Sequence, residues 1–132
     1  METFSVKTSS RTDLVDITRE VVATVAGTGL RDGLCVVYVP HTTAGITINE
    51  NADPAVRADI EATLEGIVPW KGSYRHAEGN SAAHVKASLM GFSIMVPVSG
   101  GRLVLGTWQG IYFCEFDGPR TRKVHVQLLP AI

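Results

Sequence analysis

The spacing of apolar residues predicts three strands in the first half of the chain. Residues 2–8 alternate weakly between polar and apolar side chains, which is typical of an edge strand. Residues 33–39, GLCVVYV, form a continuous apolar run bounded by Gly and Pro, so we expect a strand buried on both faces. Residues 42–49, TTAGITIN, alternate again, which predicts a strand with two unlike faces.

Three helices are predicted where a capping residue precedes an apolar stripe of helical period. A short polar side chain can accept a hydrogen bond from a backbone amide of the first turn. The candidate N-caps are Thr18, Asp53 and Asn80. Pro54 follows one of them at the first helical position, where proline is tolerated. We expect the first helix to cover about 19–27 and the three helices to end at Gly27 or Gly29, at Pro69 and at Gly91.

The last third of the chain has the pattern of consecutive antiparallel strands. Residues 92–98 form one apolar run, and the GG pair at 100–101 predicts a hairpin turn into 102–109. Residues 110–116 and 121–129 follow, separated by the turn DGPR. Six to seven mostly antiparallel strands and three helices predict an α+β fold. No linker or repeat interrupts residues 1–132, which we expect to form a single domain.

Composition and charge remove several classes of function. Of the 132 residues, 45% are hydrophobic and 19% are charged, which is typical of a globular protein. The net charge of −1 disfavours a general nucleic-acid binder, which usually carries a basic excess. No apolar run approaches the roughly 18 residues of a membrane span, and the first residues lack a signal-peptide core. The expectation is therefore a cytoplasmic protein without a membrane or nucleic-acid partner.

The stretch YRHAEGNSAAHVKAS, residues 74–88, is the first candidate site. The helix wheel places His84 at the edge of the predicted buried face, while His76 and Glu78 precede the helix. The helix start at Asn80 has free backbone amides and can hold an anion. A capped helix with a structural histidine would show the same pattern, so both interpretations stay open.

Two further polar clusters follow apolar strands. In HTTAGITINENADP, residues 41–54, the polar side chains are His41, Thr42, Thr43, Asn49, Glu50, Asn51 and Asp53. The alternative roles are helix capping for Asp53 and turn formation for Asn49 and Asn51. In GTWQGIYFCEFDGPR, residues 106–120, Gln109 and Glu115 interrupt apolar positions. Asp117 is typical of a turn, and Arg120, Arg122 and Lys123 of a solvated edge from which one cation can bind phosphate.

The two cysteines and the histidines leave specific questions open. Cys35 and Cys114 lie in apolar runs, which favours buried, reduced thiols, but Cys114 can also face a site. His41, His76 and His84 suit a zinc site or an acid–base set. Their spacing matches no established metal motif.

Together the three stretches resemble the YjbQ-like family: VPHTTAGITINENADP at 39–54, YRHAEGNSAAHVKAS at 74–88 and GRLVLGTWQGIYFCEFDGPR at 101–120. The resemblance implies a β-rich α+β domain that assembles as a homotrimer. It also implies a secondary thiamine phosphate synthase activity. This reaction joins a hydroxymethylpyrimidine diphosphate to a thiazole phosphate and releases pyrophosphate. The resemblance carries site roles over to His41, Thr42, Thr43, Asn49, Glu50, Asn51, Asp53, His76, Glu78, Asn80, His84, Gln109 and Glu115.

The leading hypothesis is therefore a transferase acting on a small phosphorylated metabolite. Its catalytic residues are expected to be His41, His76, Glu78 and His84. Thr42, Thr43, the helix start at Asn80 and Arg120 are expected to hold phosphate, with a divalent ion such as Mg²⁺ bridging the diphosphate. One alternative is a hydrolase with zinc bound by His41, His76 and His84. The other is a trimer that binds a metabolite without turnover.

Overall fold

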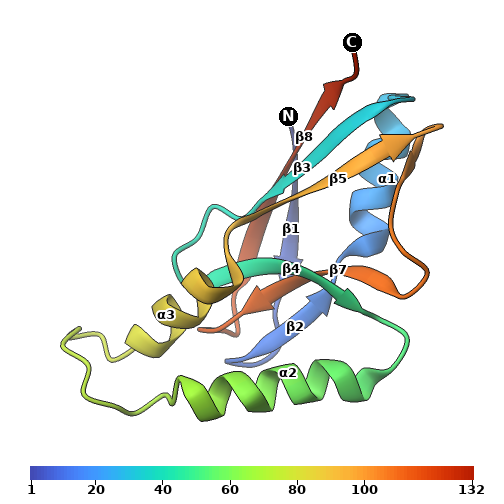
Figure 1. The fold of residues 1–132 in the computed structure, drawn as a ribbon. Coiled ribbons are helices and arrows are strands. Elements are labelled where there is room, and N and C mark those ends of the chain that lie inside the picture. The colour runs from blue at the N-terminus through green and yellow to red at the C-terminus, as the bar shows by residue number, and fades with distance from the viewer.

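The computed structural model describes all residues 1–132 as two antiparallel sheets with three helices (Figure 1). The five-stranded sheet has the order β1-β8-β3-β5-β6, and the three-stranded sheet has the order β2-β7-β4. The strands are β1 (Glu2–Lys7), β2 (Asp13–Asp16), β3 (Gly33–Tyr38), β4 (Ala44–Glu50), β5 (Ser93–Ser99), β6 (Arg102–Leu103), β7 (Gln109–Glu115) and β8 (Thr121–Pro130). The helices are α1 (Thr18–Thr28), α2 (Pro54–Ile67) and α3 (Ser81–Met90). The predicted α+β class is confirmed.

The two sheets enclose the main core. Inward side chains of the larger sheet, such as Val37 and Val124, meet Ile46 and Phe113 of the smaller sheet, and all four are almost fully buried. A second apolar cluster lies on the outer face of the smaller sheet, under α2 and α3, and includes Cys114. Strand β7 is therefore buried on both faces, and burial raises the pKa of the Cys114 thiol to about 12. Cys114 is a core residue.

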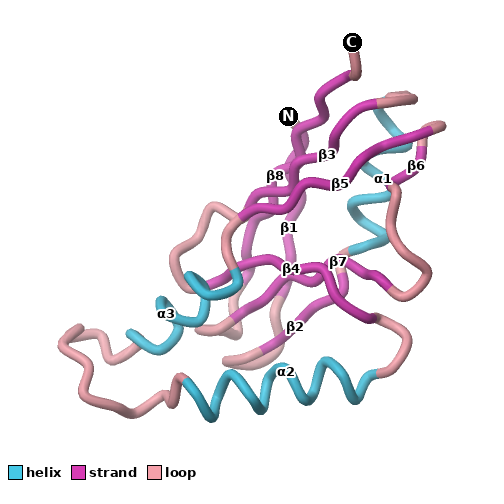
Figure 2. Tube along the Cα trace, in the orientation of Figure 1, coloured by secondary structure: helices cyan, strands magenta, loops and turns pink.

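The prediction that residues 33–39 are buried on both faces is wrong. Along β3, Cys35 and Val37 point into the core, while Leu34 and Tyr38 are 39% and 47% exposed. The strand lies between β8 and β5 in the middle of the large sheet, and no helix of the chain covers the outer face of this sheet (Figure 2). The apolar run is therefore explained by an outward apolar surface and not by a second layer of the same chain. The expected edge position of residues 2–8 is confirmed by β1.

The N-cap predictions have different outcomes. Asp53 caps α2 by accepting a hydrogen bond from the Ala55 backbone amide at 2.9 Å. Thr18 does not cap α1: it is the first helical residue, and its amide and hydroxyl both donate to Asp16. Asn80 occupies the N-cap position of α3, but its side chain bonds elsewhere.

The contact between α3 and β4 positions the helix that carries the candidate site. The Ile46 amide donates to the Gly91 carbonyl at 3.0 Å, where the helix ends. A Cβ atom on Gly45 would lie 2.6 Å from that same carbonyl oxygen, so only glycine permits this approach. The N-terminus of α3 is thereby held near the loop between β3 and β4. None of the three helices has the length and apolar composition of a membrane span.

Candidate functional site

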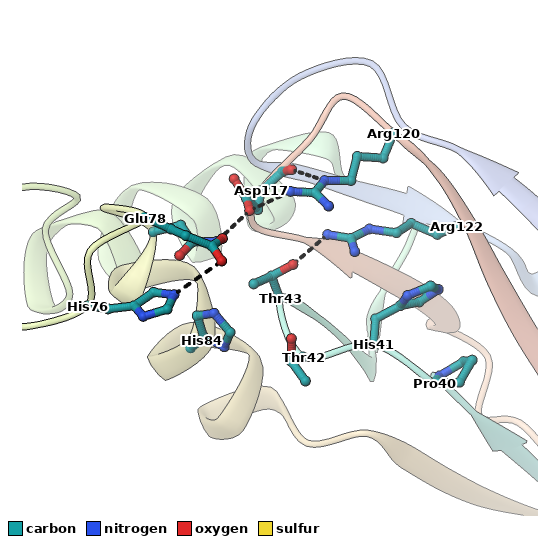
Figure 3. A pocket seen from close by; sticks show the side chains of 11 residues that line it. Pro40, His41, Thr42, Thr43, His76, Glu78, His84, Asp117, Arg120 and Arg122 are labelled. Carbon is teal, nitrogen blue, oxygen red and sulfur yellow. Dashed lines mark hydrogen bonds and ion pairs between the residues drawn. The ribbon is translucent and has the colours of Figure 1, made fainter.

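A polar cavity of about 460 Å³ lies where the two sheets, the loop before α3 and the start of β8 meet (Figure 3). Three segments distant in sequence line it: residues 40–43, residues 76–84, and residues 117–122, which form the β7–β8 turn and the start of β8. Apart from Pro40, every residue of its wall has a polar or charged side chain. The lining residues are Pro40, His41, Thr42, Thr43, His76, Glu78, Asn80, His84, Asp117, Arg120 and Arg122.

A buried ion pair forms the base of one wall. The Glu115 carboxylate is fully buried and accepts hydrogen bonds from the Nε and Nη2 atoms of Arg122, which is only 4% exposed. Thr8 and the backbone amides of Phe116 and Asp117 complete the carboxylate's partners. This full set of bonds offsets the desolvation of the two charges and fixes the guanidinium in one orientation.

The fixed guanidinium leaves one nitrogen for a ligand. Nη2 of Arg122 also donates to Thr43 Oγ1 at 2.8 Å, so Nε and Nη2 are both occupied. Nη1 donates to no group of the protein, and Arg122 lines the cavity. Beside it, Arg120 is half-exposed and bonds to Asp117 through Nε and Nη2. Two cations therefore border the same cavity, where they favour an anionic ligand.

His41 is held as a neutral hydrogen-bond donor. Its Nε2 atom accepts from the Lys123 backbone amide at 2.9 Å, which requires that Nε2 carries no proton. Burial lowers the pKa of His41, and the positive charge of Arg122 lowers it further. The proton of the neutral ring is then on Nδ1, so His41 offers one more N–H to its surroundings.

The opposite wall carries the other two histidines. The rings of His76 and His84 are perpendicular with centroids 5.5 Å apart, and both border the cavity. Nε2 of His76 lies 3.9 Å from Oε1 of Glu78, which is too long for a hydrogen bond but close enough for attraction once the ring is protonated. Figure 3 shows these three side chains facing the two arginines across the cavity. The two histidines and the two arginines therefore occupy opposite sides of the cavity.

The start of α3 is open towards the same space. Asn80 does not cap its own helix, because its Nδ2 atom donates to Asp117 Oδ2 at 2.9 Å. The first-turn amides of the helix therefore lack a side-chain partner, and the positive end of the helix dipole borders the cavity. The helix start expected from the sequence therefore borders the cavity, and its binding of an anion stays a prediction.

Five of the residues predicted for the site lie elsewhere. Strands β4 and β7 run antiparallel, with Ala44 opposite Glu115 at the cavity end and Glu50 opposite Gln109 at the far end. Seven residues of strand separate the two ends by roughly 20 Å. The residues at the far end are Asn49, Glu50, Asn51, Asp53 and Gln109.

Local hydrogen bonds account for most of this far group. Asn49 accepts from its neighbouring amide, and Gln109 accepts from the Gly106 amide at 2.8 Å. Asn51 donates to Asp16 and packs against Gly110, where a Cβ atom would lie 2.6 Å from its Nδ2 atom. The predicted residues that do line the cavity are His41, Thr42, Thr43, His76, Glu78, Asn80, His84 and Arg120. Glu115 lies behind it, bonded to Arg122.

Sequence reasoning missed Asp117 and Arg122 as cavity residues. Asp117 has the composition of a turn, and Arg122 was assigned to a solvated edge. Side chains alternate between the two faces of β8, however, and Arg122 lies on the same inward face as Val124 and Val126. An arginine on a buried face needs a buried acceptor, and Glu115 is the one acidic residue within the apolar run of β7. Their complementary positions are the signal that could have identified the pair.

The three histidines do not form a metal cluster. No group of three or more His, Cys, Asp or Glu side chains in the structure is arranged to hold a metal ion. His41 also uses its Nε2 atom for the Lys123 amide, so it is not free to serve as a ligand through that nitrogen. The side chains present therefore do not fit a resident zinc ion of the kind the sequence allowed.

Comparison with known proteins identifies close relatives over nearly the whole chain. Residues 2–131 match the family model described as UPF0047 protein YjbQ-like. The UPF0047 protein YugU of Bacillus subtilis is 53% identical over 130 residues, which cover 98% of both chains. A UPF0047 protein of Methanocaldococcus jannaschii is 49% identical over 126 residues, covering 96% of this chain and 91% of that protein.

Solved structures support the same assignment. A crystal structure of a YjbQ/UPF0047 family protein from Clostridium acetobutylicum superposes with a TM-score of 0.96 at 55% identity, covering 98% of this chain and all of the other. A protein of Aeropyrum pernix has a TM-score of 0.94 at 42% identity, covering 99% of this chain and all of the other. These similarities establish the fold and the kinship of the chain.

Proposed function

Because the chain belongs to the YjbQ-like UPF0047 family and carries a polar cavity with cations facing histidines, we propose that it is an enzyme acting on a small phosphorylated metabolite. The reaction we favour is a transfer of the secondary thiamine phosphate synthase type, in which a diphosphate leaves. The observation that carries the proposal is the free Nη1 atom of Arg122, held towards the cavity by the buried Glu115.

The arginine wall suits a phosphate or diphosphate. Nη1 of Arg122, the half-exposed Arg120 and the neutral N–H of His41 are all donors, and phosphate oxygens are all acceptors. Thr42 and the open start of α3 add a hydroxyl and backbone amides on the same cavity. A diphosphate in the transfer step also brings a divalent ion such as Mg²⁺, and Glu78 is the cavity carboxylate that lacks a hydrogen-bonded partner.

The histidine wall suits the proton transfer. When the carbon–oxygen bond to the diphosphate breaks and the acceptor nitrogen attacks that carbon, the departing diphosphate gains negative charge. His76 or His84 in its protonated form donates a proton to that group as a general acid. Glu78, 3.9 Å from His76, is placed to orient that ring. We assign His41 to binding, because its lowered pKa keeps it neutral.

Turnover by single variants tests this assignment. His76→Ala and His84→Ala are expected to lower the rate of pyrophosphate release by about 10²-fold or more, as the loss of a general acid does. The substrates are hydroxymethylpyrimidine diphosphate and thiazole phosphate, with Mg²⁺ present. Ser88→Ala is the matched control, because Ser88 lies one turn after His84 and bonds only to that turn's carbonyl. Full activity in both histidine variants would refute their catalytic role.

We also propose that the protein acts as a homotrimer in the cytoplasm. The uncovered face of the five-stranded sheet carries exposed apolar side chains at Leu34, Tyr38, Met95 and Leu129. Neighbouring strands bring these positions together, since Leu34 pairs with Leu129 and Val36 with Met95. A contiguous apolar surface of this kind is typical of a subunit interface.

The cysteines support the proposed location in the cytoplasm. Both are free and buried, which agrees with a reducing compartment.

A further inference from the structure

The side chain of Asn80 contains an acceptor that no group of the protein satisfies. Asn80 is 8% exposed and lines the cavity, and its Oδ1 atom is buried without a hydrogen-bond partner. It is the one buried side-chain nitrogen or oxygen in the chain in this condition. An unpaired buried acceptor is rare in folded proteins, because it loses its bond to water and gains none in return.

The orientation of the Asn80 amide follows from its neighbours. Its other end lies 2.9 Å from Asp117 Oδ2, and the same oxygen accepts from Arg120 Nη2 at 2.7 Å. A carboxylate that pairs with an arginine can only accept, so Asn80 must present its NH₂ group to Asp117. Rotating the amide would place two oxygens against each other. Oδ1 is therefore fixed as the unpaired atom.

The dianion of a phosphate monoester cannot by itself supply the missing partner. The groups that face an anion in this cavity are donors: Arg122 Nη1, Arg120 and the N–H of His41. A fully ionised phosphate offers acceptors only, so it satisfies these groups and leaves Asn80 Oδ1 unchanged. Besides its phosphate, the ligand therefore needs a second polar group that donates a hydrogen bond.

The two groups of the ligand must lie close together. Asn80 and Arg120 bond to the same oxygen of Asp117, so the unpaired acceptor and one of the cations are separated by little more than two hydrogen bonds. A single small molecule can therefore reach both.

We infer that the ligand of this cavity carries an N–H or O–H donor near its phosphate, and that Asn80 Oδ1 accepts from this donor. The inference rests on the proposed function and adds a specificity-determining residue to it. Asn80 then selects among phosphorylated metabolites by a hydrogen bond to the organic part. Phosphate monoesters of purely apolar groups are excluded from full affinity, since their dianions leave the buried oxygen unpaired.

The test compares two phosphate esters of equal size. 2-Hydroxyethyl phosphate has a neutral donor where propyl phosphate has a methyl group, and both carry the same phosphate. We expect the full-length protein to bind the hydroxyl ester about five- to tenfold more tightly in NMR titrations, which is the effect of one hydrogen bond to a buried acceptor. Asn80→Leu should bind the two esters equally, and only the hydroxyl ester should shift the Asn80 side-chain carbonyl resonance of the unmodified protein.

Each outcome separates this inference from the proposed function. If both esters bind equally to the unmodified protein and Arg120→Ala weakens both, the anion site stands and the donor inference is wrong, with a water molecule pairing Asn80. If neither ester binds at millimolar concentration, the anion site itself is refuted and the inference falls with it. The comparison on the unmodified protein decides the matter even if Asn80→Leu fails to fold.

Discussion

At the scale of single residues, the pair of Glu115 and Arg122 connects the core to the candidate site. Both side chains are more than nine-tenths buried, and their bonds reach Thr8 at the end of β1 and Thr43 before β4. The pair is thus both a structural link between segments and the support of a ligand-binding nitrogen. These two roles can be separated, because stability depends on charge balance while anion binding depends on the guanidinium.

Substitutions of this pair give the first prediction. Glu115→Gln leaves the arginine charge buried without its carboxylate, and should lower the free energy of unfolding by about 3–5 kcal/mol. Arg122→Met should lower the free energy of unfolding by a similar amount, since it leaves the buried carboxylate without its cation. The double variant Glu115→Leu with Arg122→Met should recover most of this loss, as apolar replacements of buried ion pairs do. Urea unfolding measures all three.

The double variant also tests the binding role. A folded double variant should bind inorganic phosphate at least tenfold more weakly than the unmodified protein, because Nη1 of Arg122 is gone. Arg19→Gln is the matched control for a general charge effect, since Arg19 is exposed on α1 and takes no part in the cavity. Unchanged phosphate binding in the double variant would show that Arg122 serves the fold alone.

The residue pattern of β8 shows how much of the site was accessible from sequence. The histidines, Glu78 and the helix start were predicted from clusters of polar residues, and these particular residues do line one cavity. Arg122 was missed because a basic residue in a strand is usually solvated, and its partner lies on another strand. Pairing across strands requires the sheet order, which a single sequence does not contain.

At the scale of elements, the errors follow from tertiary context overriding local propensity. Strand β2, Asp13–Asp16, was not predicted because it is four residues long and has an aspartate at each end. It forms because β7 offers it a free edge, with Leu14 opposite Cys114. Thr18 has good capping chemistry, yet Asp16 takes the cap role two residues earlier and leaves Thr18 Oγ1 to accept from the Ile111 amide.

The contact between α2 and α3 gives a prediction at this scale. Lys86 on α3 is 2% exposed, and its ammonium bonds to Glu65 on α2, which is half-exposed. Lys86→Met should leave stability within about 1 kcal/mol of the unmodified protein or raise it, because an apolar chain of similar length fills the site. Glu65→Ala should destabilise by about 1–3 kcal/mol, since the ammonium stays buried without its partner. Thermal and urea unfolding distinguish the two.

The same contact has a defined pH dependence. The hydrogen bond from Lys86 lowers the pKa of Glu65 below its ordinary value of 4.5. A carboxyl whose pKa is lowered by folding stabilises the folded state above the unfolded value, and this stabilisation is lost as the pH falls through the lowered pKa. The acid limb of the stability curve should therefore be shallower in Lys86→Met. An identical acid limb in both proteins would contradict this assignment.

At the scale of the whole molecule, the polar motifs divide between the two ends of the smaller sheet. His41 to Thr43 lie at the cavity end of β4, and Asn49 to Asp53 lie at its other end. The sequence presents both groups as one motif because the single strand β4 connects them. A strand carries the chain straight away from its starting point, so neighbours in a motif need not be neighbours in space.

The outer face of the five-stranded sheet gives the last prediction. Its central strand is apolar on the outward side as well as the inward side, and Met95 on the adjacent β5 is 66% exposed. If this face is the interface of a homotrimer, Met95→Glu places charges within it and should shift the mass measured by light scattering from about three chains to one. Glu20→Gln on α1, away from this sheet face, should remain a trimer. A Met95→Glu protein that keeps three chains would place the interface elsewhere, whereas a monomeric unmodified protein would leave this apolar face without a partner copy and refute the trimer.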